Sequence, residues 1–227
     1  MSGRRSLLRT LRRLHIWAGW LIGVPLLLWT ATGLWMVARP IEEVRGSASR
    51  RDPPPLMIPP GSAPPTLSRP VRSLALEQRP HGAVWVARFV DGEIARADAR
   101  GRWLPPLSRA EAEAIARATY LAPSTIARAT LTSADAPPLE LRQHRPAWGI
   151  RFTDGTNLYV DADSGAVLAL RTRQWRAFDL MWGLHIMDLK GRDDTSHPVL
   201  IGAAALSFVS VLIGLVLLPL VGRFRGR

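Results

Sequence analysis

Two long apolar segments constrain the fold of this chain more than any other feature of its sequence. The first, residues 14–38, contains His15 as its one titratable side chain, and the second, residues 197–221, contains only His197. Each exceeds the ~20 residues that a helix needs to cross the hydrocarbon core of a lipid bilayer. The first segment is also longer than the ~7–15-residue apolar region of a signal peptide, and its end, LWMVARP, is a poor cleavage site. We therefore expect two transmembrane α-helices, the first of them an uncleaved anchor.

Basic residues mark the outer ends of both apolar segments. The formal net charge is +12, and five arginines lie in residues 1–13 while three lie in residues 222–227. This placement follows the positive-inside rule, so both termini are expected in the cytoplasm and the residues between the helices outside it. In a Gram-negative cell the chain would lie in the inner (cytoplasmic) membrane with a periplasmic domain. The same placement argues against nucleic acid as the partner.

Absent residue types and motifs narrow the chemistry. The chain has no cysteine, which excludes disulfides, thiolate-ligated zinc and iron–sulfur clusters held by cysteine. No Ser-His-Asp constellation, HExxH motif, phosphate loop, or flavin or nicotinamide fingerprint occurs in the sequence. Metal chemistry would have to use His, Met, carboxylates or a bound cofactor.

The stretch between the apolar segments is long enough for a domain. It starts with a proline-rich tether, residues 39–70, which is expected to be extended and semi-rigid. In residues 71–172, HGAVWVARFV alternates apolar and polar residues, and Asp91-Gly92 predicts a hairpin turn into EIARADARG. Two further turns are predicted at Asp154-Gly155 and Asp163-Ser164-Gly165. This pattern indicates antiparallel strands.

One helix is expected in the same domain, in the sequence SRAEAEAIARATY, residues 108–120. Ser108 is its predicted N-cap, and Glu111 completes a capping box. Small apolar residues recur along one face at helical spacing, which suits packing on a sheet. The expected fold class is a membrane protein whose two transmembrane α-helices flank an α+β extracytoplasmic domain with an antiparallel sheet and a helix.

Several segments together resemble a known family. LSRAEAEAIARATY followed by WGIRFTDGTNLYVDADSGAVLALR is similar to the PepSY domain, a helix with a β-meander. LRRLHIWAGWLIGVPLLLWTATGL and WRAFDLMWGLHIMD resemble segments of PepSY-associated transmembrane proteins. Larger relatives in that group have four membrane helices and include haem-b siderophore-iron reductases. The resemblance implies membrane electron transfer to an external ferric substrate, but this chain has only two membrane helices and would draw electrons from a partner or from quinol.

The first residue of interest for this function is His15, which begins the first apolar segment next to Arg12 and Arg13. On a helix it shares a face with Gly19 and Gly23, a GxxxG pair that lets a second helix approach closely. The same space would admit a flat macrocycle. An ionisable group within a membrane span indicates function, although a neutral imidazole at the interface costs little.

The second is His185, in residues 173–190, which we expect to form an interfacial amphipathic helix. The residues that share its side of the helix are Trp175, Phe178, Trp182 and Leu189. An imidazole on this aromatic side needs a hydrogen-bond partner or a ligand. Haem iron, a backbone carbonyl and a lipid headgroup are the alternatives.

The expected positions of these histidines exclude one haem between them in a single chain. His15 lies at the cytoplasmic edge and His185 at the opposite edge of a membrane core ~30 Å thick. A homodimer would place two copies of each histidine at the same edge, so that each pair could ligate one haem b. Within one chain, His197 or Met36 are alternative axial partners for His185. Their simpler interpretations are an interface residue and core packing.

Two other functions fit the same sequence. PepSY domains also occur in peptidase propeptides, so the resemblance also implies a non-enzymatic, membrane-anchored binding or regulatory module. On that interpretation the helices are anchors and the histidines are interfacial. The chain could instead be an accessory subunit of a larger membrane complex. If the protein is an enzyme, we expect a haem-dependent reductase component, since the external domain shows no catalytic constellation.

Overall fold

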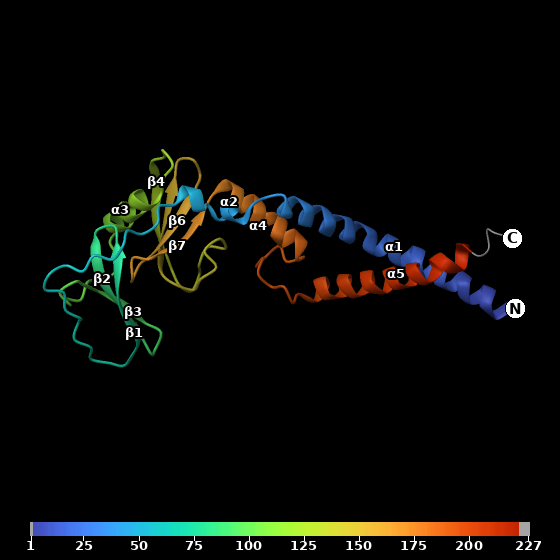
Figure 1. Ribbon diagram of the computed structural model, residues 1–227, viewed down its shortest axis with the longest axis horizontal. Helices are drawn as coiled ribbons and strands as arrows, with labels where there is room; N and C mark the ends of the chain where they lie inside the picture. Colours follow the sequence, from blue (N-terminus) through green and yellow to red (C-terminus); the bar gives the residue numbers. More distant parts are fainter. Residues whose placement is uncertain (1, 223–227) are drawn as a thin grey trace. The chain divides into compact units, whose positions relative to one another are not determined.

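The computed structural model describes the backbone of residues 2–222 and the side chains of residues 6–219 (Figure 1). The predicted basic tail beyond residue 222 and the side chains of the first five residues lie outside the described part. The chain forms two compact units. The helical unit comprises residues 1–39 together with 177–227, and the α+β unit comprises residues 40–176.

Three helices belong wholly or in part to the helical unit. They are α1 (Ser2–Val37), the C-terminal part of α4 (Arg173–His185) and α5 (Pro198–Gly222). Two stretches, Ser6–Val37 and Pro198–Pro219, are long and apolar enough to cross a membrane, and only 11% and 6% of their most apolar windows are buried. A core helix of a water-soluble protein would be mostly buried, so this exposure is typical of membrane spans.

Helices α1 and α5 pack side by side and antiparallel (Figure 1). Ile22 is a buried residue of α1 within this helix pair. Near one end of the pair His15 contacts Ser210, and near the other Leu26 and Leu200 line the same small cavity. The two apolar helices therefore associate within one chain, along a stretch that includes His15.

Helix α4 packs on α1 between Trp29 and Trp35, and Trp29 also lines a cavity with Leu200 of α5. The rings of Trp35 and Phe178 lie 6.3 Å apart, and those of Trp29 and His185 lie 5.2 Å apart. Residue numbers increase along α4 in the direction in which they decrease along α1, so the two helices are antiparallel. His185 thus lies against α1 itself, at the level of Trp29.

An aspartate-centred turn ends α4 at His185, five residues before the predicted boundary. Met187 has a φ of 58°, which a right-handed helix does not contain. The carboxylate of Asp188 then accepts four backbone N–H groups between residues 190 and 194. The prediction that Leu189 extends the aromatic side of this helix was wrong, because these bonds replace the helical ones.

Within residues 40–176, seven strands form two antiparallel sheets. The three-stranded sheet has the order β1-β2-β3 and consists of Val71–Arg79, Gly82–Phe89 and Ile94–Asp98. The four-stranded sheet has the order β4-β5-β6-β7 and consists of Ile126–Thr132, Ala147–Phe152, Asn157–Asp161 and Val167–Arg171. The short helices α2 (Ile41–Arg45) and η1 (Ser47–Ser49) precede them.

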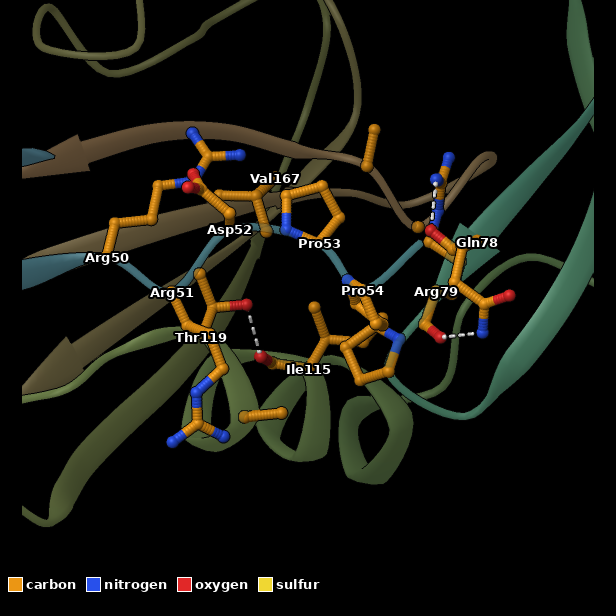
Figure 2. A pocket seen from close by; sticks show the side chains of 14 residues that line it. Arg50, Arg51, Asp52, Pro53, Pro54, Gln78, Arg79, Ile115, Thr119 and Val167 are labelled. Atoms are coloured by element: carbon orange, nitrogen blue, oxygen red, sulfur yellow. Dashed lines mark hydrogen bonds between the residues drawn. The ribbon is translucent and has the colours of Figure 1, made fainter. Parts of the chain in front are cut away.

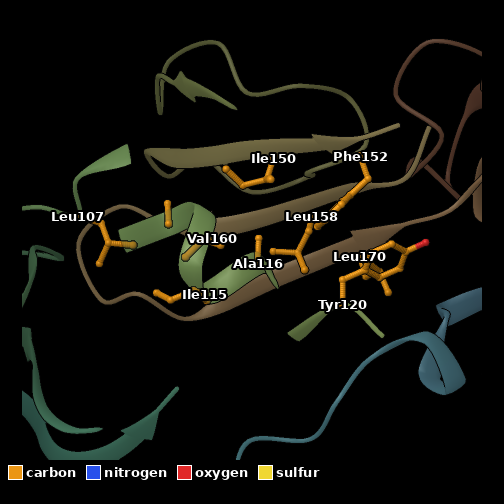
Figure 3. Packing of buried hydrophobic residues seen from close by; sticks show 10 residues of the cluster. Leu107, Ile115, Ala116, Tyr120, Ile150, Phe152, Leu158, Val160 and Leu170 are labelled. Carbon is orange, nitrogen blue, oxygen red and sulfur yellow. The ribbon is translucent and has the colours of Figure 1, made fainter. Parts of the chain in front are cut away.

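The core of the α+β unit lies between α3 (Arg109–Thr119) and the four-stranded sheet (Figure 3). Ile115 of α3 and Ile150 and Leu158 of the sheet belong to the same buried cluster. The predicted capping box is confirmed, because the side chains of Ser108 and Glu111 each accept the other's backbone N–H. The helix therefore starts where its sequence pattern indicates.

The three predicted turns are also confirmed. Gly92, Gly155 and Gly165 all have positive φ, between 70° and 92°, and each follows a strand of an antiparallel pair. Strands β1 and β4 were not expected from the sequence. The fold class is confirmed, since two long apolar helices flank a domain of antiparallel sheets and a helix.

Candidate functional site

His15 is held by the neighbouring helix. Its Nδ1 lies 3.0 Å from the backbone oxygen of Ser210, and the Ser210 hydroxyl is 3.3 Å away. A carbonyl oxygen only accepts, so Nδ1 carries the proton of the neutral ring and Nε2 keeps its lone pair. The ring also lies on Gly214, where an added Cβ would be 3.0 Å from Cε1. A glycine is thus needed for this close approach.

His185 has the same kind of partner on α1. Its Nδ1 lies 3.1 Å from the backbone oxygen of Trp29 and 3.2 Å from the hydroxyl of Thr32. Thr32 donates its own proton to the Leu28 carbonyl at 2.8 Å, so its oxygen is free to accept from Nδ1–H. In the neutral form of the ring the proton therefore again lies on Nδ1, and Nε2 keeps its lone pair.

Two indoles stack on the His185 ring. Trp29 lies 5.2 Å away with an interplanar angle of 19°, and Trp182 lies 6.4 Å away with an angle of 24°. Gly33 gives the ring room, since a Cβ there would be 3.1 Å from its Cε1. The aromatic surroundings expected from the sequence are present, with Trp29 as a member that the sequence pattern of α4 did not reveal.

The turn after α4 contacts the helix residues next to His185. Trp182 Nε1 donates to the backbone oxygen of Arg192 at 3.0 Å. The guanidinium of Arg192 in turn pairs with the buried carboxylate of Asp179 at 2.8 Å. These contacts join the two ends of the turn to the helix that carries His185.

The two histidines lie far apart along α1. Seventeen positions separate residue 15 from residue 32, where His185 is bound, and a rise of ~1.5 Å per residue makes this ~25 Å. This separation is too large for both rings to bind one metal ion, as the sequence predicted.

The other two proposed ligands have different surroundings. Nδ1 of His197 lies 3.3 Å from the backbone N–H of Val199, so it accepts that bond and the neutral ring carries its proton on Nε2. In this position His197 caps the first turn of α5. Met36 is half-buried, and in residues 6–219 no described contact joins its sulfur to His185.

The GxxxG pair of α1 does not contact α5. An added Cβ at Gly19 or Gly23 would meet no heavy atom within 4 Å. Two glycines on an open helix face permit close approach of another helix. No group of three or more His, Cys, Asp or Glu suited to a metal ion occurs in the part of the chain that the structure describes, so any metal here would rely on one or two histidines and a cofactor.

A separate cavity of about 530 Å³ lies in the α+β unit, between α3, the end of β1 and the segment after η1 (Figure 2). Its apolar lining includes Ile115, Val167 and Pro53. Arg50 and Arg51 also line it. The sequence pattern does not predict this cavity, because four separate segments form its walls.

Comparison with known proteins identifies the second half of the α+β unit. Residues 106–171 match the model of the PepSY family, described as the peptidase propeptide and YPEB domain. The match begins just before α3 and ends with β7, so it covers the helix, the four-stranded sheet and the core between them. No curated protein and no solved structure matched the chain. The protein therefore contains a PepSY domain between two candidate membrane helices.

Proposed function

We propose that this PepSY-domain protein is a membrane electron-transfer protein that binds haem b through His15 and His185. The observation that carries the proposal is the shared hydrogen-bond pattern of the two rings. Each donates Nδ1–H to a backbone carbonyl of a neighbouring helix, at 3.0 Å and 3.1 Å. Histidines that ligate metals almost always make such a bond with the nitrogen that faces away from the metal.

The carbonyl partners prepare both rings for ligation. They fix the tautomer, hold the ring orientation and raise the basicity of Nε2, the atom left to bind a metal. His15 and His185 would hold the iron, and haem iron supplies one-electron chemistry by cycling between its ferric and ferrous states. The donor set fits haem b, which needs neutral imidazoles and no cysteine.

A haem bound by either histidine needs a second axial ligand, and this ligand must come from another residue than the other of these two histidines in the same chain. The two sites lie ~25 Å apart along α1, so His15 and His185 of one chain cannot ligate the same iron. A second copy of the chain supplies a matching histidine at each edge, because a twofold axis brings identical residues together. The open face at Gly19 and Gly23 supports a helix–helix contact of this kind. A partner subunit with its own histidines is the alternative.

The acceptor proposed from the family resemblance is a ferric chelate of the siderophore type on the outer side of the membrane. In this role the α+β unit carries the substrate or a partner, and the two helices carry the electrons. The donor is a partner protein or quinol. The protein would act as a component of a haem-dependent reductase.

The test is the absorption spectrum of the detergent-purified protein, oxidised and then reduced with dithionite. The proposal predicts a Soret band with sharp α and β bands after reduction, weakened in His15→Ala and in His185→Ala. His81→Ala is the matched control, because His81 is an exposed turn residue of the α+β unit, and its spectrum should equal that of the wild type. A colourless protein after expression with added haem precursor would contradict the proposal.

The 530 Å³ cavity supports a second function, that of a membrane-anchored binding module. A concave site that combines apolar and polar side chains is the usual form of a ligand site, and this one adjoins α3 of the PepSY domain. The two functions differ in one measurement. A binding module would keep its partner after removal of both helices and would be colourless.

A further inference from the structure

Two arginines lie directly opposite each other on the four-stranded sheet. Arg128 of β4 pairs with Arg151 of β5 in the strand register, and both are exposed. The next pair along the strands, Ala129 and Ile150, faces the other way, and Ile150 is buried in the core under α3. The two arginines therefore share the face of the sheet that α3 does not cover.

This pair has no compensating charge in the described structure. Like charges directly opposite each other on neighbouring strands destabilise a sheet. Within residues 6–219, neither guanidinium has a described hydrogen bond or ion pair. Glu140, a carboxylate bound to the same face, already accepts from Tyr159 at 2.7 Å and pairs with Arg176 at 3.0 Å. The two positive charges thus remain to be neutralised from outside.

The arginines line a recess of about 270 Å³. Its other walls include Thr130, Thr132 and Tyr159. Gly149 keeps the recess open between them, since a Cβ there would be 3.1 Å from the Tyr159 ring. Hydroxyl groups and guanidinium groups therefore face the same small space.

One buried acceptor on this recess also lacks a donor. Asn157, which lines the recess, donates its amide N–H to Glu140. Its Oδ1 is buried and has no hydrogen-bond partner among the described residues. A buried acceptor without a donor is costly, so a ligand with an O–H group would stabilise this site.

We propose that this recess binds a small oxyanion of the phosphate class that carries a protonated oxygen, such as hydrogenphosphate or a phosphate monoester. The guanidinium groups of Arg128 and Arg151 donate to its charged oxygens, as the fork geometry of arginine favours. The O–H group of the ligand donates to Oδ1 of Asn157. The small size of the recess, about 270 Å³, suits a small soluble anion. This site is independent of the proposed haem function.

The experiment measures the melting temperature of the detergent-solubilised full chain in phosphate and in chloride at equal ionic strength. Anything that binds only the folded state raises its stability with concentration, so phosphate should give a saturable increase in melting temperature. Arg128→Gln and Arg151→Gln should each weaken the apparent affinity by roughly tenfold or more. Arg100→Gln is the control, because Arg100 is an exposed turn residue of the same unit and loses the same charge.

Two further readouts separate binding from a purely structural role of the arginines. In chloride, Arg151→Gln should melt at or above the wild-type temperature, because the repulsion between the pair is removed. Sulfate, which has no proton to donate, should bind more weakly than phosphate. The proposal would be overturned by equal stability in phosphate and chloride, by an equal loss in Arg100→Gln, or by stabilisation with phosphatidylglycerol vesicles but not with phosphate.

Discussion

Polar groups in the α+β unit and in the helical unit are satisfied to different degrees. In the α+β unit, Oδ1 of the fully buried Asp161 accepts from two backbone N–H groups and from the Ser164 hydroxyl, and Oδ2 forms an ion pair with Arg145 at 2.7 Å without a hydrogen bond. In the helical unit, His15 and His185 each use Nδ1 and leave Nε2 without a partner in the described residues. A buried carboxylate with several local donors and an ion-pair partner helps to fix a fold, whereas a half-bonded imidazole in an apolar helix pair is a candidate site. The two units should therefore respond to different substitutions.

The largest effect is expected for Asp161→Ala in the α+β unit. The substitution removes a buried partner of Arg145, 2.7 Å away, and two bonds from the turn at Ser164. Arg145 is partly exposed, so losing the ion pair costs less than the ~3–5 kcal/mol of a fully buried pair; with the two turn bonds lost as well, we expect a total of ~3 kcal/mol. Thermal unfolding followed by near-ultraviolet circular dichroism should show the loss. Asp163→Ala, in the same turn, should cost far less.

The comparison requires that Asp161→Ala leave the proposed haem binding unaffected. The haem content per folded chain should equal that of the wild type, because the histidines lie in the other unit. If Asp161→Ala lost as much haem as His185→Ala, haem binding in the helical unit would depend on the α+β unit, which would contradict the comparison.

The second effect is expected for Asp179→Ala in the helical unit. It removes the ion pair to Arg192, whose backbone holds the indole of Trp182 over His185. Since Arg192 is partly exposed, we expect a cost of ~2 kcal/mol, below that of a fully buried pair. Haem retention measured after gel filtration should fall at the His185 site. Asp193→Ala, an exposed neighbour in the same turn, should behave like the wild type.

The third effect concerns pH and the capping box of α3. Burial alone would raise the pKa of Glu111, but hydrogen bonds from Ser108 and Arg96 outweigh it and lower the pKa to about 2. Because the folded pKa lies below the ordinary value of 4.5, the contribution is complete above about pH 4.5 and is lost as the pH falls toward 2. Glu111 is partly exposed, so the contribution is ~1 kcal/mol.

Glu111→Gln tests this contribution directly. The variant should be less stable at pH 7, and its stability should change less than that of the wild type between pH 4.5 and pH 2. Thermal unfolding over this range measures both differences. An unchanged pH profile in the variant would assign the acid sensitivity of the α+β unit to other carboxylates.

The smallest effect is expected for Thr32→Val. The bond from Nδ1 of His185 to the Trp29 carbonyl remains, and only the second acceptor at 3.2 Å is lost. The cost should be ~0.5–1 kcal/mol, seen as a small shift in the midpoint of a haem titration. Ser210→Ala is the matching change at His15, where the hydroxyl lies 3.3 Å away. If either variant abolished binding, the carbonyl would not be the main partner of its histidine.

Local sequence signals were sufficient for some elements and misleading for others. The capping box at Ser108 and the turns at Gly92, Gly155 and Gly165 depend on short-range chemistry, and all were predicted. The pentapeptide IARAT shows the limit of such signals. It occurs twice, as the helical residues 115–119 and as the strand residues 126–130.

Context decides the conformation of this repeated pentapeptide. The first copy follows a capping box and an alanine- and glutamate-rich turn, which favour a helix. The second follows Ala122-Pro123-Ser124, which interrupts the helix, and pairs along β5. Strand β4 was missed because its own residues do not specify a strand without that partner.

The sequence marks His15 and His185 as candidates but does not reveal their contacts. The positions of His15 and His185 next to apolar segments marked both histidines. Their partners Ser210 and Trp29 lie 195 and 156 positions away along the chain, so no local pattern reveals them. Thr32 and Ser210 are small polar residues inside apolar helices, which is a weak signal because Thr30 and Ser207 share it.

The most direct test of the central claim is the haem content of the purified protein and of its two histidine variants, measured as the pyridine haemochrome. Two separate sites in a homodimer predict two haems per two chains in the wild type. His15→Ala and His185→Ala should each retain about half of that haem, and the double variant none. Full haem content in both single variants, or complete loss in either one, would contradict two independent sites held by these histidines.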